Sequence, residues 1–183
     1  PQLIPGNIGF VSQSGSLGEA LINRAQNRAI GMSYFISTGN EEVLESSDYI
    51  EYLLDDSHTS VIVWLMEGLR NAEKFLRIAD IASDKKKPIV VIKVARTAVG
   101  RKAANFHAGY RMGSDAVYEA IFRQKGIIRV AEPDELYVTA SMLARNRFPK
   151  GNRIGIITDT IAGGVILLDK LVELGMVIPQ LNP

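Results

Sequence analysis

Residues 100–115 contain the side chain that is best suited to take part in catalysis. This stretch follows an apolar run at residues 89–94 and carries His107, one of only two histidines, among glycines and basic residues. A neutral imidazole nitrogen is a competent nucleophile near pH 7. A loop beyond the carboxyl end of a strand is also where open α/β sheets place their chemistry. A histidine without a task in a surface loop is the alternative, and spacing alone does not separate the two.

Glu67 is the second candidate. It directly follows residues 61–66, a nearly continuous apolar run typical of a strand covered on both faces. A carboxylate at the carboxyl end of a central strand lies on the functional edge of an open sheet. A solvated acid at the end of a strand is the alternative interpretation.

The third candidate is the turn formed by Ser14, Gly15 and Ser16. It joins an apolar run at residues 8–12 to a helical pattern at residues 17–30. Backbone N–H groups and hydroxyls at such a turn would face an anion, and the helix dipole would favour the charge of a phosphate. An ordinary helix cap, whose glycines serve only the turn, fits the same residues.

Alternating strand and helix patterns must position these groups. The expected strands are residues 8–12, 32–37, 61–66, 89–94 and 127–130, and the expected helices are residues 17–30, 46–54, 72–82, 116–124 and 132–143. Strands that alternate with helices predict an α/β fold, a doubly wound parallel sheet of flavodoxin-like type. Right-handed crossovers would then bring Ser14, Asn40, Glu67 and His107 to one edge of the sheet.

A second unit is expected after residue 145. Residues 146–152 are a polar, basic linker, and the pattern of the N-terminus then repeats as a strand at 153–158, a turn at 159–164 and a helix at 165–174. One strand and one helix are too little to bury a core. We therefore expect a flavodoxin-like domain at residues 1–145, followed at residues 146–183 by the incomplete start of a second, similar domain.

Composition narrows the classes of partner. The chain has 183 residues with 21 basic and 20 acidic side chains, and a net charge of +1 gives no case for nucleic acid. It has no cysteine, and two histidines far apart in sequence make a metal site unexpected. No apolar run reaches the length of a membrane span. We expect a cytoplasmic protein with no membrane partner.

Taken together, the motifs resemble the succinyl-CoA synthetase superfamily, and most closely its NDP-forming acyl-CoA (acetyl-CoA) synthetase branch. The matching segments are residues 9–18 with the family's first turn, 37–40 with its Ser-x-Gly-Asn loop, 67–68 with its glutamate, 93–100 with its Lys-x-Gly-Arg-Thr segment, 103–115 with its phosphohistidine segment, and 158–169 with the opening of its next flavodoxin-like domain. The joint order and spacing of these pieces carry the resemblance.

The resemblance implies roles for individual residues. His107 would be the nucleophile that carries phosphate, and Glu67 would accept a hydrogen bond from its other ring nitrogen and so fix the tautomer. The remaining implied site residues bind phosphate: Ser14, Gly15, Ser16 and Gly109 in the first domain, and Thr158, Gly163 and Gly164 in the second.

The resemblance also implies an activity. The chain would be the central domain of an acid–thiol ligase that carries phosphate between an acyl phosphate and NDP/NTP. A CoA-binding Rossmann domain and an ATP-grasp domain or subunit would supply CoA, NTP/NDP and Mg²⁺, with a small carboxylic acid and phosphate as further substrates. We expect the complete enzyme to be an oligomer. We also expect the isolated chain to be inactive.

Two departures from the family pattern keep other functions open. Phe106 precedes the histidine where a small residue is usual, and Asp159 stands where the family has asparagine. An unpaired acid beside a phosphate site is unfavourable. A catalytically degenerate regulatory or scaffolding relative, such as the ligase-like region of an acyltransferase, is therefore the alternative. A flavin or dinucleotide binder is less favoured, because the first turn lacks Gly-x-Gly-x-x-Gly.

Overall fold

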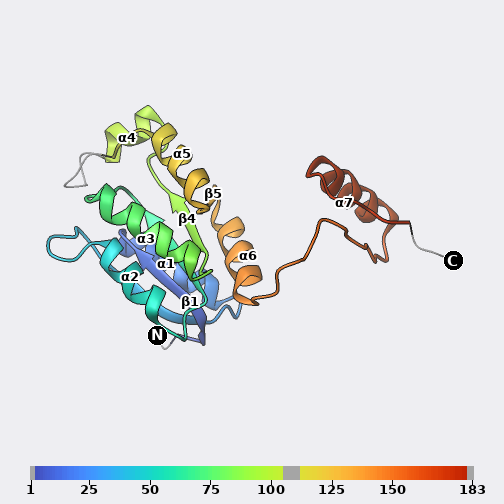
Figure 1. Cartoon of the computed structure of the whole chain (residues 1–183), viewed down its shortest axis with the longest axis horizontal. Helices are drawn as coiled ribbons and strands as arrows, with labels where there is room; N and C mark the ends of the chain where they lie inside the picture. Colours follow the sequence, from blue (N-terminus) through green and yellow to red (C-terminus); the bar gives the residue numbers. More distant parts are fainter. Residues whose placement is uncertain (1–2, 105–111, 181–183) are drawn as a thin grey trace. The chain divides into compact units, whose positions relative to one another are not determined.

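The computed structural model describes residues 3–104 and 112–180. The chain forms two compact units, Pro1–Asn146 and Arg147–Pro183, which are considered one at a time (Figure 1). His107 and Gly109 lie outside the described residues, so the sequence predictions for them stay predictions.

The first unit is built on a parallel sheet of five strands. The strands are β1 (Pro5–Ser12), β2 (Met32–Ser37), β3 (Val61–Met66), β4 (Ile89–Lys93) and β5 (Ile128–Val130). They are ordered β2-β1-β3-β4-β5, and each neighbouring pair is parallel. This order confirms the flavodoxin-like, doubly wound fold.

Helices cover both faces of this sheet. The helices are α1 (Gly15–Gln26), α2 (Ser46–Asp55), α3 (Ala72–Asp84), α4 (Ala98–Ala104), α5 (Asp115–Lys125) and α6 (Pro133–Ala144). One apolar core joins the sheet to α2, α3 and α5, and a second joins it to α1 and α6. Figure 1 shows α2 and α3 side by side on one face of the sheet.

The central strand β3 explains why the two cores form. All six of its residues are buried, so neither face of the strand shows the polar alternation of a half-exposed strand. The Trp64 ring packs against Phe75 of α3 at 5.6 Å between centroids. Burying large apolar side chains on both faces is the main favourable term that holds such a sheet together.

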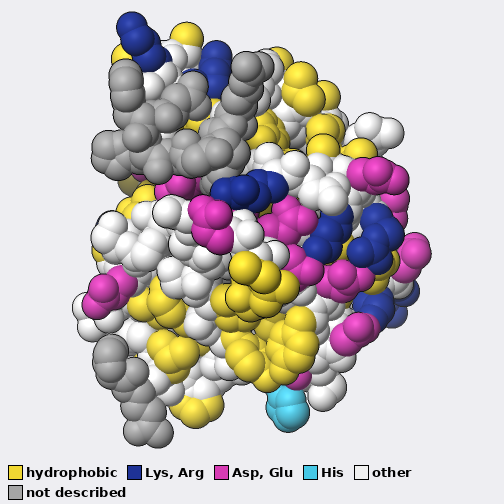
Figure 2. All heavy atoms as spheres, turned by 90° about the vertical axis from the view of Figure 1, so that its left-hand side faces the viewer, with side chains coloured by type: hydrophobic (Ala, Val, Ile, Leu, Met, Phe, Trp, Pro, Cys, Tyr) yellow, Lys and Arg dark blue, Asp and Glu magenta, His cyan; other side chains and the backbone are white. Residues whose placement is uncertain are grey.

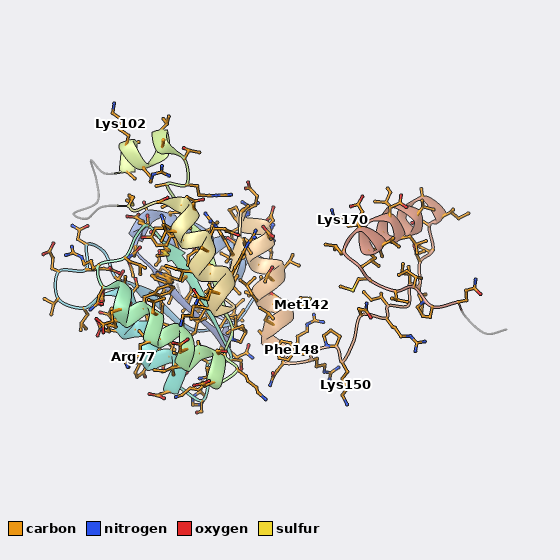
Figure 3. The ribbon with its side chains drawn as sticks, turned by 45° about the horizontal axis from the view of Figure 1, so that its top comes forward. Arg77, Lys102, Met142, Phe148, Lys150 and Lys170 are labelled. Carbon is orange, nitrogen blue, oxygen red and sulfur yellow. The ribbon has the colours of Figure 1, made fainter. Side chains whose placement is uncertain are left out.

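Ion pairs connect the outer surfaces of α2 and α3. The pairs are Lys74–Asp48, Arg77–Glu51 and Lys85–Asp55. Figure 2 shows basic and acidic side chains intermixed on one face of the molecule, and Figure 3 shows Arg77 on the outside of its helix. The Arg77–Glu51 and Lys85–Asp55 pairs are exposed, and such pairs each contribute about 0–1 kcal/mol, so the buried cores dominate stability.

The starts of β1 and β2 approach each other unusually closely. A Cβ added at Gly6 would lie 2.2 Å from the Gly31 carbonyl carbon, and one added at Gly31 would lie 2.3 Å from the Pro5 oxygen. Real side chains do not tolerate such contacts with backbone atoms. Glycine at both positions is therefore required for this pairing.

Three local features differ from the sequence expectations, the first being that β1 begins at Pro5 and not at residue 8. The helix expected at residues 17–30 ends at Gln26, because Ala29 takes a left-handed conformation with φ 56° and turns the chain toward β2. Residues 98–104, expected as part of a loop, form α4. The Thr97 hydroxyl accepts a hydrogen bond from the Gly100 N–H at 3.0 Å, which caps the start of this short helix.

The second unit contains α7 (Ile161–Glu173). The expected strand at residues 153–158 is wrong: the described part of this unit shows only an isolated parallel bridge between Arg153 and Val177. A strand is stabilised by neighbours, and here Ile157 is fully exposed with no strand beside it in the described residues. Within residues 3–104 and 112–180, none of the helices has the length and apolar character needed to span a bilayer.

Candidate functional site

The carboxyl ends of the strands meet at one edge of the sheet. Beyond the ends of β1, β2 and β3, the Thr38 N–H donates to the Ser12 carbonyl at 2.8 Å, and the Gln13 N–H donates to the Leu65 carbonyl at 3.1 Å. These bonds place the loops that contain Ser14, Asn40 and Glu67 beside one another. The Arg70 guanidinium also donates to the Asn40 carbonyl at 2.7 Å.

Ser14 is the N-cap of α1. Its backbone is extended (φ −102°, ψ 117°), and its hydroxyl accepts a hydrogen bond from the Leu17 N–H at 3.4 Å. Gly15 and Ser16 are exposed and form the start of the helix, whose first turn contains no acidic residue. The N–H groups of Gly15 and Ser16 and the positive end of the dipole thus lie at the same edge as Glu67.

Glu67 directly follows β3, and its backbone is held by Gln13. The Gln13 side-chain oxygen accepts hydrogen bonds from the N–H groups of Glu67 (2.5 Å) and Gly68 (3.1 Å). The Gln13 amide nitrogen donates to the Gly68 carbonyl at 3.0 Å. Gln13 is only 5% exposed, so its polar atoms are satisfied by this backbone.

Lys93 holds the other side of the same segment. Its ammonium group donates to the carbonyls of Glu67 and Val94, both at 2.7 Å, and lies over the Tyr118 ring at 4.8 Å from the centroid. The residue is 3% exposed. Burial lowers the pKa of Lys93 to about 8, although the nearby Asp115 carboxylate partly opposes that shift.

Helix α5 carries Tyr118 and begins at Asp115. The Tyr118 phenol makes a hydrogen bond with the Leu69 backbone, and burial raises its pKa. The Arg129 guanidinium of β5 binds Asp115 at 2.5 Å and Glu119 at 3.0 Å. These contacts fix the first turns of α5 against the sheet, close to Lys93.

The remaining predicted site residues lie in the second unit. The Thr158 hydroxyl accepts a hydrogen bond from the Thr160 N–H at 3.1 Å, and Gly163 and Gly164 lie in the first turn of α7. The small-residue turn expected at residues 159–164 is therefore wrong from residue 161 onward, because the chain is already helical there. The three residues stay a prediction as a second phosphate site.

Gln13 and Lys93 are the contacts that the sequence analysis did not assign. A lysine at the end of the otherwise apolar run 89–94 was a signal, because a buried cation needs local partners. Gln13 gave a weaker signal, since a polar residue after a buried strand fits any turn. In the part of the chain that the structure describes, no three histidine or acidic side chains are grouped so that they could hold a metal ion.

Comparisons with known proteins place this architecture in a family. The family model described as the succinyl-CoA ligase-like flavodoxin domain matches residues 5–143. A curated ADP-forming acetate–CoA ligase of Methanocaldococcus jannaschii is 39% identical over 171 residues, which are 93% of this chain and 24% of that protein. The alpha subunit of the ADP-forming acetate–CoA ligase I of Pyrococcus furiosus is 38% identical over 174 residues, 95% of this chain and 37% of that subunit.

A solved structure agrees with these sequence relatives. It is described as the dinucleotide-forming acetyl-coenzyme A synthetase 1 of Ca. Korarchaeum cryptofilum in complex with phosphate and ADP. It is 33% identical, with a TM-score of 0.90 over 99% of this chain and 39% of its own. The chain thus spans between 24% and 39% of the length of these relatives. The five-stranded parallel sheet, the capped turn beside Glu67 and the family match together show that the chain belongs to the succinyl-CoA ligase-like flavodoxin domain family.

Proposed function

We propose that this chain is the phosphate-carrying, flavodoxin-like domain of an NDP-forming acyl-CoA synthetase. The observation that carries the proposal is its 39% identity over 171 residues to an ADP-forming acetate–CoA ligase. The location of Glu67 beside the helix cap at Ser14 supports it. The carboxylate would orient the unphosphorylated histidine ring, and the turn would bind the phosphoryl group once the histidine is phosphorylated.

His107 is the residue that carries phosphate in this proposal. In the direction of thioester synthesis, a His107 ring nitrogen attacks the γ-phosphorus of NTP, and the bond to the NDP leaving group breaks. The phosphoryl group then passes to the carboxylate of a small acid, which forms an acyl phosphate and frees the histidine. The sulfur of CoA attacks the acyl carbon, the thioester forms, and inorganic phosphate leaves.

The residues of this chain have defined tasks in that sequence. Glu67 accepts a hydrogen bond from the ring nitrogen of His107 that does not carry phosphate, and so keeps the other nitrogen nucleophilic. The N–H groups and hydroxyls at Ser14, Gly15 and Ser16 hold the phosphoryl group, with the N–H of Gly109 as a further donor. Thr158, Gly163 and Gly164 form the matching site of the second unit.

CoA, the nucleotide and Mg²⁺ belong to other parts of the assembly in this proposal. A CoA-binding Rossmann domain and an ATP-grasp domain or subunit would complete the enzyme, and the assembled enzyme is an oligomer. The length of the relatives supports further domains, since the chain covers 24% of one ligase and 37% of an alpha subunit.

Incubation of the complete synthetase with γ-labelled NTP and Mg²⁺ tests this function. We expect an acid-labile, base-stable label on the domain, as a phosphohistidine gives, and its loss in the variant His107→Ala. His58, the other histidine, is 84% exposed beside Asp56 and provides the control variant His58→Ala, which should keep the label. A label that survives His107→Ala would remove the assignment.

A regulatory or scaffolding relative is the second candidate. Asp159 is exposed directly before Thr160, the N-cap of α7, where its carboxylate would compete with a phosphate for the positive end of the helix. An unlabelled wild-type protein in the same assay, with nucleotide and CoA still bound by the assembly, would favour this candidate.

A further inference from the structure

The peptide groups on both sides of Gly68 are held by side chains. Strand β3 ends at Met66. Beyond it, the Gln13 side chain accepts hydrogen bonds from the N–H groups of Glu67 and Gly68 and donates one to the carbonyl of Gly68. The Lys93 ammonium donates a hydrogen bond to the carbonyl of Glu67. Two side chains therefore satisfy four backbone polar groups that the sheet no longer pairs.

This arrangement is costly and needs a local reason. The other four residues of β4 are apolar, and a fifth apolar residue at position 93 would complete the strand without burying a cation. The Lys93 ammonium is instead enclosed by the Glu67 carbonyl, the Val94 carbonyl and the Tyr118 ring. The buried Lys93 ammonium fixes the position of the backbone at Glu67.

We propose that Gln13 and Lys93 are positioning residues for the phosphate-transfer reaction, which together fix the backbone from which the Glu67 carboxylate projects. The inference rests on the proposed function, in which Glu67 orients His107. It also connects Glu67 to the other two candidate site segments. Gln13 adjoins Ser14 of the helix cap, and Lys93 ends the strand that leads toward the histidine segment. Neither residue has to touch the phosphoryl group.

The opposite end of the sheet offers a matched pair of controls. The Gln26 side chain accepts from the Ile4 N–H at 2.6 Å and donates to the Ile30 carbonyl at 2.9 Å. The Lys87 ammonium donates to the carbonyls of Leu53 and Asp56, and burial lowers its pKa too. These residues support backbone in the same chemical way as Gln13 and Lys93, but they lie far from Glu67 in the fold.

Amide hydrogen exchange in the 183-residue chain tests the hold on the backbone without any assumption about activity. We expect Gln13→Met to speed exchange at Glu67 and Gly68 by about tenfold or more, because their acceptor is lost. Gln26→Met should speed exchange at Ile4 and leave Glu67 and Gly68 as in the wild type. Unchanged exchange at Glu67 and Gly68 in folded Gln13→Met would overturn the proposal.

Single-turnover phosphorylation of the complete synthetase tests the consequence. We expect Gln13→Met and Lys93→Met each to slow labelling by about 10- to 100-fold, the usual effect of losing an orienting partner. The nucleotide KM should stay within about twofold, because the nucleotide contacts another domain. Gln26→Met and Lys87→Met should label at the wild-type rate.

The two experiments separate the possible failures. Loss of folding in one site variant is recognised from the exchange data, and the other site variant then carries the test of the labelling rate. Faster exchange with an unchanged labelling rate would overturn the positioning role and leave His107 phosphorylation intact. A wild-type enzyme without label would remove the proposed function, and the role with it, whatever the exchange rates.

Discussion

Lys93 shows how one side chain connects stability to the site. Its ammonium is buried against two carbonyls and an aromatic ring, and burial lowers its pKa from 10.5 to about 8. The charged groups that act on it come from several elements: Glu67 after β3, Arg101 of α4, Asp115 of α5 and Arg129 of β5. The folded chain therefore holds this proton less tightly than the unfolded chain does.

The free energy of unfolding should consequently depend on pH through Lys93. Between about pH 8 and 10.5 the unfolded chain binds more protons at this residue, so its contribution to stability rises with pH. It is fully present above 10.5 and is lost as the pH falls through about 8. The slope is at most about 1.4 kcal/mol per pH unit for one proton.

Urea unfolding at a series of pH values measures this effect as a difference between variants. The difference between wild type and Lys93→Met should change across that window, whereas Lys150→Met, an exposed lysine of the linker (Figure 3), should follow the wild type throughout. A constant difference between wild type and Lys93→Met from pH 8 to 10.5 would contradict the prediction.

Strand pairing depends on glycines where β1 and β2 begin. A Cβ at Gly31 would lie 2.3 Å from the Pro5 oxygen, and the clash is with backbone that cannot rotate away. We expect Gly31→Ala to destabilise the chain by about 1–3 kcal/mol, the usual cost of overpacking. Gly151→Ala, where a Cβ would meet nothing within 4 Å, should change stability by less than about 0.5 kcal/mol. Equal unfolding midpoints for the two variants would contradict the prediction, because the pairing of β1 with β2 would then tolerate a side chain at residue 31.

The N-termini of α1 and α7 should differ in anion binding. The first turn of α1 has serine hydroxyls and no acid, whereas Asp159 and the bulky Ile161 stand at the start of α7. We expect phosphate titration, followed by amide NMR shifts, to affect Gly15 and Ser16 more than Gly163 and Gly164. Larger shifts at α7 would reverse this ranking.

The sequence was most informative where packing decides the structure. The strands at residues 32–37 and 61–66 have the expected bounds. All six residues of 61–66 are buried, and such a continuous apolar run leaves a clear pattern. It was least informative where single backbone conformations or tertiary partners decide, as at Ala29, where a left-handed residue ends α1 early. The strand expected at residues 153–158 failed for the second reason, since its pattern was correct but no partner strand is described beside it.

The candidate site divides in the same way. Glu67 and Ser14 could be selected from the sequence because strand ends and helix caps leave local signatures. The contacts of Gln13 with Glu67 and Gly68 join residues 54 and 55 positions apart, and those of Lys93 with Glu67 join residues 26 apart. Only the strand order brings them together, so no local pattern could reveal them.

The molecule as a whole should require other domains for turnover. The chain spans 24% of a related ligase, and in our proposal the nucleotide and CoA bind elsewhere. We expect the pure 183-residue chain to form neither acyl phosphate nor thioester from acid, CoA and NTP. A hydroxamate assay for the acyl phosphate and a thiol assay for CoA consumption measure this, with the complete synthetase as positive control. Product from the pure chain would overturn the division of tasks between domains.

In our proposal, the hydrogen bonds between Gln13 and the backbone at Glu67 also lower the entropic cost of the reaction. Gln13 adjoins the cap of α1 and binds the peptide groups at Glu67, so the first turn of α1 and the backbone of Glu67 are linked in one hydrogen-bonded frame. Bringing a carboxylate and anion-binding amides into register ordinarily costs conformational freedom when the substrate arrives. In the proposed reaction that freedom is already lost when the sheet folds, and the phosphoryl group would meet partners that are already in place.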